Sequence, residues 1–290
     1  MNLEVVANSL VSGFLLGGIL ALTALGLSIA LGVMRLVNLA HGELLVGGSY
    51  LGYFLLRMTG IDPIAGLALV GAAMALMAFP LQRILIAPLA GKGMEAPMIT
   101  MFGVSVILQN LFLLAFSADT RAIDTPYAAS AVRLGPVTVP EIYVIGFAVS
   151  VVLVVLVHLL VSRTAFGREL RASSSDAGAA AAMGVDVRRV HALTFALGAA
   201  CAAMGGVLLG TAFSFTPSSG GTYLLISFAV VVLGGIGNIF GTLVAGIVLG
   251  LLQSLGAVVF GDGYRDLVGL VLFLLALALR PQGIVGSGVR

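Results

Sequence analysis

Charged residues are scarce in this chain of 290 residues: they make up 9% of the sequence, whereas hydrophobic residues make up 60%. Soluble domains carry roughly 25% charged residues, so a folded soluble form of this chain would not cover its own apolar surface. Tryptophan is absent, and the single cysteine, Cys201, excludes a framework of disulfide bonds within the chain. The scarcity of charge predicts an integral membrane protein.

Catalytic and metal-binding motifs are also missing from the sequence. The three histidines, His41, His158 and His191, have no second metal ligand three or four residues further along, and no Gly-x-Ser-x-Gly or His-Glu-x-x-His motif occurs. Gly91-Lys92-Gly93 lacks the spacing and the hydroxyl of a phosphate-binding loop. We therefore expect no enzyme activity, catalytic residue, metal or cofactor in this chain, and any ATP hydrolysis must come from another chain.

Continuous apolar segments make up most of the sequence. About 20 apolar residues cross a hydrocarbon core of about 30 Å as a helix, whereas the strands of an outer-membrane barrel would alternate apolar and polar residues. We therefore predict an all-α integral membrane protein with about eight or nine transmembrane helices, forming one membrane domain over 1–290. The segments lie at about 5–33, 40–56, 63–82, 96–116, 142–162, 191–213, 223–236, 239–260 and 265–279.

The basic residues predict the orientation of the chain, because short cytoplasmic connections carry an excess of Lys and Arg. With the N-terminus outside and the C-terminus in the cytoplasm, ten of the fourteen Lys and Arg residues lie in cytoplasmic connections. The opposite orientation would reverse this ratio. The ten are Arg35, Arg83, Lys92, Arg163, Arg168, Arg171, Arg188, Arg189, Arg280 and Arg290.

Two interruptions of the apolar pattern, one in each half of the chain, indicate broken helices. The first is the polar run 35–43, in which Asn38 is placed to cap the following helix and Glu43 to lie in its positive first turn. The second is the glycine-rich run 234–241. A single helix over 223–260 would rise about 57 Å, which is too long for one crossing. Whether both of its segments cross fully stays open.

Paired interruptions of this kind are typical of inverted-repeat transporters, whose pathway runs through the breaks. Two ordinary interfacial turns would give the same spacing, and this alternative stays open. Of the twelve acidic residues, only Glu43 is expected at depth in the membrane, which disfavours an ion-coupled carrier without excluding it. The candidate pathway residues are Asn38, His41, Glu43, Gly234, Gly235, Gly237 and Asn238.

The connection 163–190 stands out among the predicted cytoplasmic segments. It carries five of the fourteen basic residues and an alanine-rich stretch from Ala177 to Met183. Because alanine has the highest helix propensity, we expect a short helix lying across the cytoplasmic face. A solvated, positively charged loop is the alternative that the residues alone leave open.

Several motifs resemble one protein family, in the order that the family has along its chain. The run Gly32–Glu43 closely resembles the signature of the branched-chain amino-acid ABC permease family, H-type subunit. Ala21–Leu27, Thr164–Ala172, Val232–Asn238 and Arg280–Gly283 fit the same pattern. Together these motifs extend over nearly the whole chain.

The resemblance implies the permease subunit of a binding-protein-dependent ABC importer in the bacterial inner membrane, which translocates leucine, isoleucine or valine. It also implies a second related permease subunit, two cytoplasmic ATP-binding subunits and a periplasmic solute-binding protein as partners, with membrane lipid around them and no nucleic acid. Related permeases serve urea, short amides and other small solutes, so the substrate stays open, as does a homo- or heteromeric permease pair. A stand-alone secondary carrier or channel, or a scaffold without transport activity, are alternatives from other classes.

The resemblance further assigns a function to 163–190. ABC importer permeases commonly carry Glu-Ala-Ala, three further residues and Gly where a short helix docks onto the ATPase. The run from Gly178 to Gly184 matches this pattern, except that Gly178 replaces the glutamate and removes a charged contact. By analogy with the family, the ATPase-coupling residues are Thr164, Gly167, Arg168, Arg171, Asp176, Ala179, Ala180 and Gly184.

Overall fold

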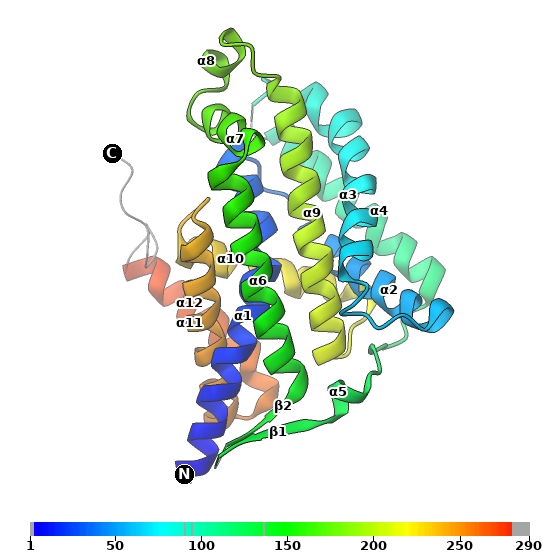
Figure 1. Ribbon diagram of the computed structural model, residues 1–290, viewed down its shortest axis with the longest axis vertical. Coiled ribbons are helices and arrows are strands. Elements are labelled where there is room, and N and C mark those ends of the chain that lie inside the picture. The colour runs from blue at the N-terminus through cyan, green and yellow to red at the C-terminus, as the bar shows by residue number, and fades with distance from the viewer. Residues whose placement is uncertain (1–2, 90, 94, 136, 280–290) are drawn as a thin grey trace.

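Most of the long helices run between an end of the molecule that holds the N-terminus and an end that holds α7 and α8 (Figure 1). The computed structural model describes residues 3–89, 91–93, 95–135 and 137–279. Its longer helices are α1 (Leu3–Met34), α2 (His41–Thr59), α3 (Leu67–Leu81), α4 (Glu95–Phe116), α6 (Glu141–Arg163), α9 (Val187–Ala212), α10 (Gly220–Gly234), α11 (Ile239–Phe260) and α12 (Arg265–Leu279). Its shorter elements are a π turn (Gln82–Ile86), 3-10 turns (Ala87–Leu89, Pro217–Ser219, Asp262–Tyr264), α5 (Pro126–Ala129), α7 (Ala165–Ser175), α8 (Ala177–Ala182), β1 (Ala131–Leu134) and β2 (Val137–Pro140).

Seven helices in the described residues are long and apolar enough to cross a membrane, which confirms the predicted helical membrane fold at this level. They cover Glu4–Met34, Leu67–Leu89, Glu95–Phe116, Glu141–Arg163, Val187–Ala212, Pro217–Gly234 and Ile239–Phe260. The predicted segments 40–56 and 265–279 are also helical, as α2 and α12, but are not among the seven. The 15 residues of α12 rise only about 22 Å, and α2 begins with the polar residues His41 and Glu43.

The glycine-rich run 234–241 separates two helices, as predicted. α10 ends at Gly234 and α11 begins at Ile239, and both are among the seven candidate spans. The alanine-rich stretch from Ala177 is helical as α8, and the preceding residues form a second short helix, α7. The predicted cytoplasmic connection is therefore a pair of short helices.

The connection between α4 and α6 contains a short β-hairpin within the otherwise helical fold. β1 and β2 form an antiparallel hairpin in which Ala131 pairs with Pro140. The β-branched run 137–139 favours an extended backbone, and the N–H of Thr138 donates to Oδ1 of Asn8 at 2.9 Å, which holds the hairpin beside the start of α1. We call this end of the molecule the hairpin end; the opposite end is the α7–α8 end (Figure 1).

Helix α1 lies at the centre of the packing. In its most apolar stretch 89% of the residues are buried, compared with 11% in α4, so α4 lies at the periphery. Glycines allow the close contacts of α1: a Cβ at Gly13 would lie 2.7 Å from the carbonyl oxygen of Gly250 in α11, and a Cβ at Gly26 would lie 2.8 Å from the carbonyl carbon of Gly198 in α9. Small residues at helix crossings are what packing in lipid requires, because apolar burial there gives no driving force between helices.

Candidate functional site

Helix α2 begins deep within the molecule rather than at one of its ends. α1 ends at Met34, and the segment 35–40 turns back along it. The Nε2 atom of His41, the first residue of α2, lies 2.8 Å from the carbonyl oxygen of Thr23. Along the axis of α1, Thr23 lies about 16 Å before the end of the helix, at a rise of 1.5 Å per residue. At the predicted interruption 35–43 the chain therefore folds back along α1 before α2 begins.

The turn of this segment is shaped by Asn38. Its side chain is 3% exposed, and its Oδ1 accepts from the N–H of Ala40 at 3.0 Å. Ala40, not Asn38, occupies the N-cap position of α2, and no side-chain cap is present there. The prediction that Asn38 caps the helix is therefore wrong in detail: its side chain closes the turn that precedes the helix, because the helix begins two residues later than the sequence suggests.

The start of α10 meets the start of α2. A Cβ added to Gly220, the first residue of α10, would lie 2.6 Å from Oε2 of Glu43, and a Cβ at Gly42 would overlap the carbonyl oxygen of Gly220. Both helices direct their positive N-terminal ends toward this contact, which lowers the cost of burying a carboxylate there. We call the contact of these two helix starts the junction. Helix starts that meet inside the molecule, rather than at its surface, are typical of transporters with discontinuous helices.

Glu43 is the acidic group of the junction. It is 4% exposed, its Oε1 accepts from Oγ of Ser105 at 3.5 Å, and its Oε2 has no hydrogen-bond partner among the described residues. On one side it borders a cavity of about 210 Å³ with an otherwise largely apolar and aromatic lining, which includes Tyr50, Phe54 and Phe112. An incompletely paired carboxylate in such surroundings is costly, so a polar or cationic group that passes here would find a partner.

The second predicted interruption lies elsewhere. Gly235 and Gly237 have φ values of +85° and +78°, which favour glycine, and Oδ1 of Asn238 accepts from the N–H of Gly241 at 2.9 Å and caps α11. Gly237 packs against Gly32 near the end of α1, about 14 Å along that helix from Thr23. The break from Gly234 to Asn238 is thus a tight turn between two helices, and the segment that meets the first interruption is instead the start of α10.

Sequence reasoning missed Gly220 and Ser105. The signal for Gly220 was present in Thr216-Pro217, since a hydroxyl residue followed by proline is typical of a helix start. Ser105 lies within the apolar helix α4 and belongs to no motif. Its contact with Glu43 depends on the packing of α4 against α2 and has no local sequence signal.

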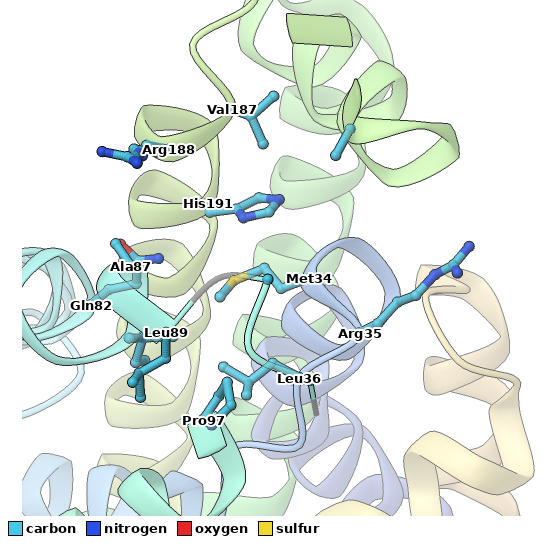
Figure 2. Close-up of a pocket in the computed structure, with 14 residues that line it drawn as sticks. Met34, Arg35, Leu36, Gln82, Ala87, Leu89, Pro97, Val187, Arg188 and His191 are labelled. Atoms are coloured by element: carbon cyan, nitrogen blue, oxygen red, sulfur yellow. The ribbon is translucent and has the colours of Figure 1, made fainter. Parts of the chain in front are cut away.

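A cavity of about 530 Å³ lies toward the α7–α8 end, between the end of α1, the π turn after α3, and the starts of α4 and α9 (Figure 2). The ring of His191 points toward Met34, whereas the guanidinium groups of Arg35 and Arg188 point away (Figure 2). Ala177 of α8 also lines this cavity. The aromatic cavity beside Glu43 is lined by Leu81, the last residue of α3. The cavity of about 530 Å³ is lined by the next residue, Gln82, which begins the π turn. The two cavities therefore lie one after the other along this part of the chain.

The predicted coupling residues lie in and around α7 and α8. Oγ1 of Thr164 accepts from the N–H of Gly167 at 3.2 Å and caps α7. Oδ1 of Asp176 accepts from the N–H groups of Gly178 and Ala179 at 2.8 and 2.9 Å and caps α8. Arg171 donates to the carbonyl oxygen of Val161 in α6.

The remaining coupling residues define which side of α8 is free. Ala180 is 5% exposed and faces the protein, whereas Arg168, Ala179 and Gly184 are exposed. Gly184 ends the segment with a φ of +88°. Met183 is 85% exposed although it is large and apolar, and the sequence analysis did not single it out. The exposed side of α8 therefore consists of small residues, and the large apolar side chain of Met183 lies directly after its last residue.

Comparison with known proteins agrees with this architecture. The family described as "Branched-chain amino acid transport system / permease component" matches residues 9–277. The high-affinity branched-chain amino acid transport system permease protein BraD of Pseudomonas aeruginosa is 33% identical over 290 residues, which cover 96% of this chain and 94% of that protein. The corresponding protein LivH of Escherichia coli K12 is 30% identical over 288 residues, which cover 95% and 94% of the two chains.

A more distant similarity links the chain to sugar permeases. The fructose import permease protein FrcC of Rhizobium meliloti is 31% identical over 201 residues, which cover 63% of this chain and 54% of that protein. No solved structure matches the chain at a significant level. The family match extends over nearly all of the described helices, and two relatives of at least 30% identity cover almost the whole chain. The chain therefore belongs to the branched-chain amino acid transport permease family, as a transmembrane permease component of an ABC transport system.

Proposed function

We propose that this permease imports branched-chain amino acids across the bacterial inner membrane, as the H-type subunit of a binding-protein-dependent complex. The names of BraD and LivH, which both describe high-affinity branched-chain amino acid transport, support this substrate class. The proposed complex contains a second related permease subunit, two cytoplasmic ATP-binding subunits and a periplasmic solute-binding protein. Residues 1–290 act in it as a single membrane domain.

The proposed pathway of the solute passes through the junction of α2 and α10. Glu43 is buried there with one oxygen unpartnered among the described residues, His41 anchors the start of α2 to α1, and Asn38 shapes the re-entrant turn. The aromatic cavity beside Glu43 offers an apolar surface for an aliphatic side chain. The break at Gly234, Gly235, Gly237 and Asn238 serves as a hinge between α10 and α11 near the end of α1.

The two ends of the molecule fit opposite sides of the membrane. The α7–α8 end holds most of the basic residues in the described connections, which favours the cytoplasm, and the hairpin end with the N-terminus then faces outward. In this orientation α2 and α12 are partial or tilted crossings, which together with the seven candidate spans gives nine membrane-embedded helices, within the predicted eight or nine. Two re-entrant helix starts, one in each half of the chain, fit an inverted repeat.

Coupling to ATP hydrolysis is proposed to run through α8 and α9. α8 presents small exposed residues to the ATP-binding subunit, and α9 follows directly after it. Farther along α9, the carbonyl oxygen of Gly206 accepts from Oγ of Ser49 in α2 at 2.7 Å. A displacement of α8 would therefore be transmitted along α9 to α2 and the junction, and the cavities on its two sides would open in turn.

Purification and reconstitution of the chain distinguish the proposed function from two others. The similarity to a fructose import permease supports an importer of another small solute as the second candidate. A stand-alone secondary carrier would need no ATPase. The tagged chain is purified from its native host in a mild detergent, co-purifying proteins are identified by mass spectrometry, and the complex is reconstituted into vesicles with ATP and the binding protein.

Leucine uptake that requires both ATP and the binding protein, together with co-purification of a second permease and ATP-binding subunits, is the expected result. Elution of the chain alone, with uptake that persists without ATP and collapses with an ionophore, would replace the importer by a secondary carrier. Uptake of urea or an amide in place of leucine would keep the importer and change its substrate.

A further inference from the structure

A third cavity, of about 350 Å³, lies toward the hairpin end between α1, the end of α9, α10, α11 and the start of α12. Its volume falls in the range of about 300–1,000 Å³ that is usual for small-molecule sites. We call it the outer cavity. Leu16, Leu20 and Ile226 supply apolar lining, and Arg265 and Asp266, consecutive residues at the start of α12, supply a positive and a negative charge.

Arg265 is held in place but retains free donors. Its Nη2 donates to Oδ1 of Asp262 at 2.7 Å, and its Cζ lies 5.6 Å from the centre of the Phe213 ring. Its Nη1 is buried and makes no hydrogen bond among the described residues, although the hydroxyl of Tyr143 also faces the guanidinium. The side chain of Asp262 is 82% exposed, compared with 22% for Arg265, so the ion pair is a surface contact that contributes little stability. A buried guanidinium donor beside a cavity remains available to an anionic group.

Asp266 supplies the opposite charge. Its Oδ1 accepts from Nε2 of Gln253 at 3.3 Å, and no other side-chain hydrogen bond to Asp266 occurs among the described residues. Gln253 is 2% exposed and also lines the outer cavity. A half-buried cation, Arg265, and an exposed anion, Asp266, therefore border the same small space beside an apolar wall.

The inner end of the outer cavity reaches the junction. Thr23 and Ser219 line it; the carbonyl oxygen of Thr23 binds His41, and Ser219 immediately precedes Gly220, which packs against Glu43. A solute in the outer cavity is thus separated from Glu43 only by the residues of the junction itself.

From these contacts we infer that the outer cavity receives a zwitterionic aliphatic α-amino acid on its way to the junction. Arg265 donates to the α-carboxylate, Asp266 accepts from the α-ammonium group, and the side chain rests on the apolar wall. This inference rests on the proposed function and adds a substrate requirement to it. An amine or a carboxylic acid satisfies one of the two charges, and neutral urea satisfies neither.

The first test measures leucine uptake by the reconstituted complex with its binding protein, per assembled complex. Arg265→Gln and Asp266→Asn are each expected to reduce uptake about tenfold, because each removes a charge-assisted hydrogen bond to the substrate. Arg133→Gln is the matched control, since Arg133 is an exposed arginine of the hairpin that does not line the outer cavity. Uptake by both cavity variants equal to that of the control would overturn the inference while leaving the importer intact. Absence of uptake by the unaltered complex would instead refute the proposed function.

The second test keeps both charges and so does not depend on how those variants fold. The single cysteine, Cys201, is 0% exposed, so Thr222→Cys, at an exposed position that lines the outer cavity, provides one accessible thiol. An impermeant thiol reagent is added from outside with leucine, 3-methylbutylamine or 4-methylpentanoate. Leucine is expected to slow labelling several-fold more than either analogue. Equal protection by all three compounds, or none by leucine, would overturn the inference.

Discussion

The Nε2 atom of His41 lies 2.8 Å from the backbone carbonyl oxygen of Thr23. Because the carbonyl oxygen accepts, Nε2 carries the proton of this hydrogen bond. Between the two residues the chain leaves α1 at Met34 and turns back on it. The bond therefore sets the depth at which α2 begins, and with it the position of Glu43.

Replacing His41 by alanine should destabilise the permease and reduce leucine uptake. The substitution removes a buried hydrogen bond and the volume of a ring that is 1% exposed, which together cost about 1–3 kcal/mol. The expected result is a lower midpoint of thermal unfolding of the purified complex. His158→Ala is the control, since His158 is half-buried in α6 beside Phe240, and it should change the midpoint less. Equal midpoints for the two variants would contradict a structural function of the His41 bond.

The junction gives a sharper comparison between two adjacent glycines. A Cβ at Gly220 would lie 2.6 Å from Oε2 of Glu43, whereas a Cβ at Gly221 meets open space. Gly220→Ala should therefore reduce leucine uptake at least about tenfold, because overpacking of this kind costs about 1–3 kcal/mol and separates the two helix starts. Gly221→Ala, at the next position of the same helix, should leave uptake within about twofold of the unaltered protein. Similar uptake by both variants would show that the junction is not part of the pathway.

The helices themselves were predictable from the sequence, because each is a long apolar run bounded by polar or glycine residues. The break at 234–238 was predictable for the same reason, since glycines in a row with Asn238 are a local signal for a turn and a cap. The sequence also predicted that Glu43, alone among the acidic residues, lies at depth in the membrane; in the structure its side chain is buried within the protein, with 4% exposed.

The pairing of the two helix starts was not predictable from local pattern. The contact of Gly42 with Gly220 joins residues that are far apart in the sequence and depends on how α9 and α10 return through the molecule. The polar residues before Gly220 resemble a loop, so the apolar pattern placed the start of that helix at 223. Arg265 was likewise not a candidate from the sequence, because its half-buried position beside Phe213 arises only from tertiary packing.

The crossing of α1 and α9 predicts a stability effect. A Cβ at Gly26 would lie 2.8 Å from the carbonyl carbon and 2.9 Å from Cα of Gly198, so the backbones must separate to accommodate it. Gly26→Ala should lower the stability of the folded permease by about 1–3 kcal/mol or more, measured as a lower thermal midpoint or a lower yield of monodisperse protein. In Gly103→Ala, the control on peripheral α4, the added methyl group meets nothing within 4 Å. An effect of equal size in both variants would contradict close packing at the α1–α9 crossing.

The cap of α8 predicts a defect in coupling rather than in folding. Oδ1 of Asp176 accepts from the N–H groups of Gly178 and Ala179, and loss of an N-cap costs about 1 kcal/mol, which is large for a helix of six residues. Asp176→Ala should therefore lower the amount of leucine transported per ATP hydrolysed by several-fold in the reconstituted complex. Asp176→Asn keeps an oxygen that can accept the same bonds, so it should restore most of the ratio. If alanine and asparagine gave the same ratio as the unaltered protein, α8 would not transmit the movement of the ATP-binding subunit, and the coupling contact would have to lie on α7.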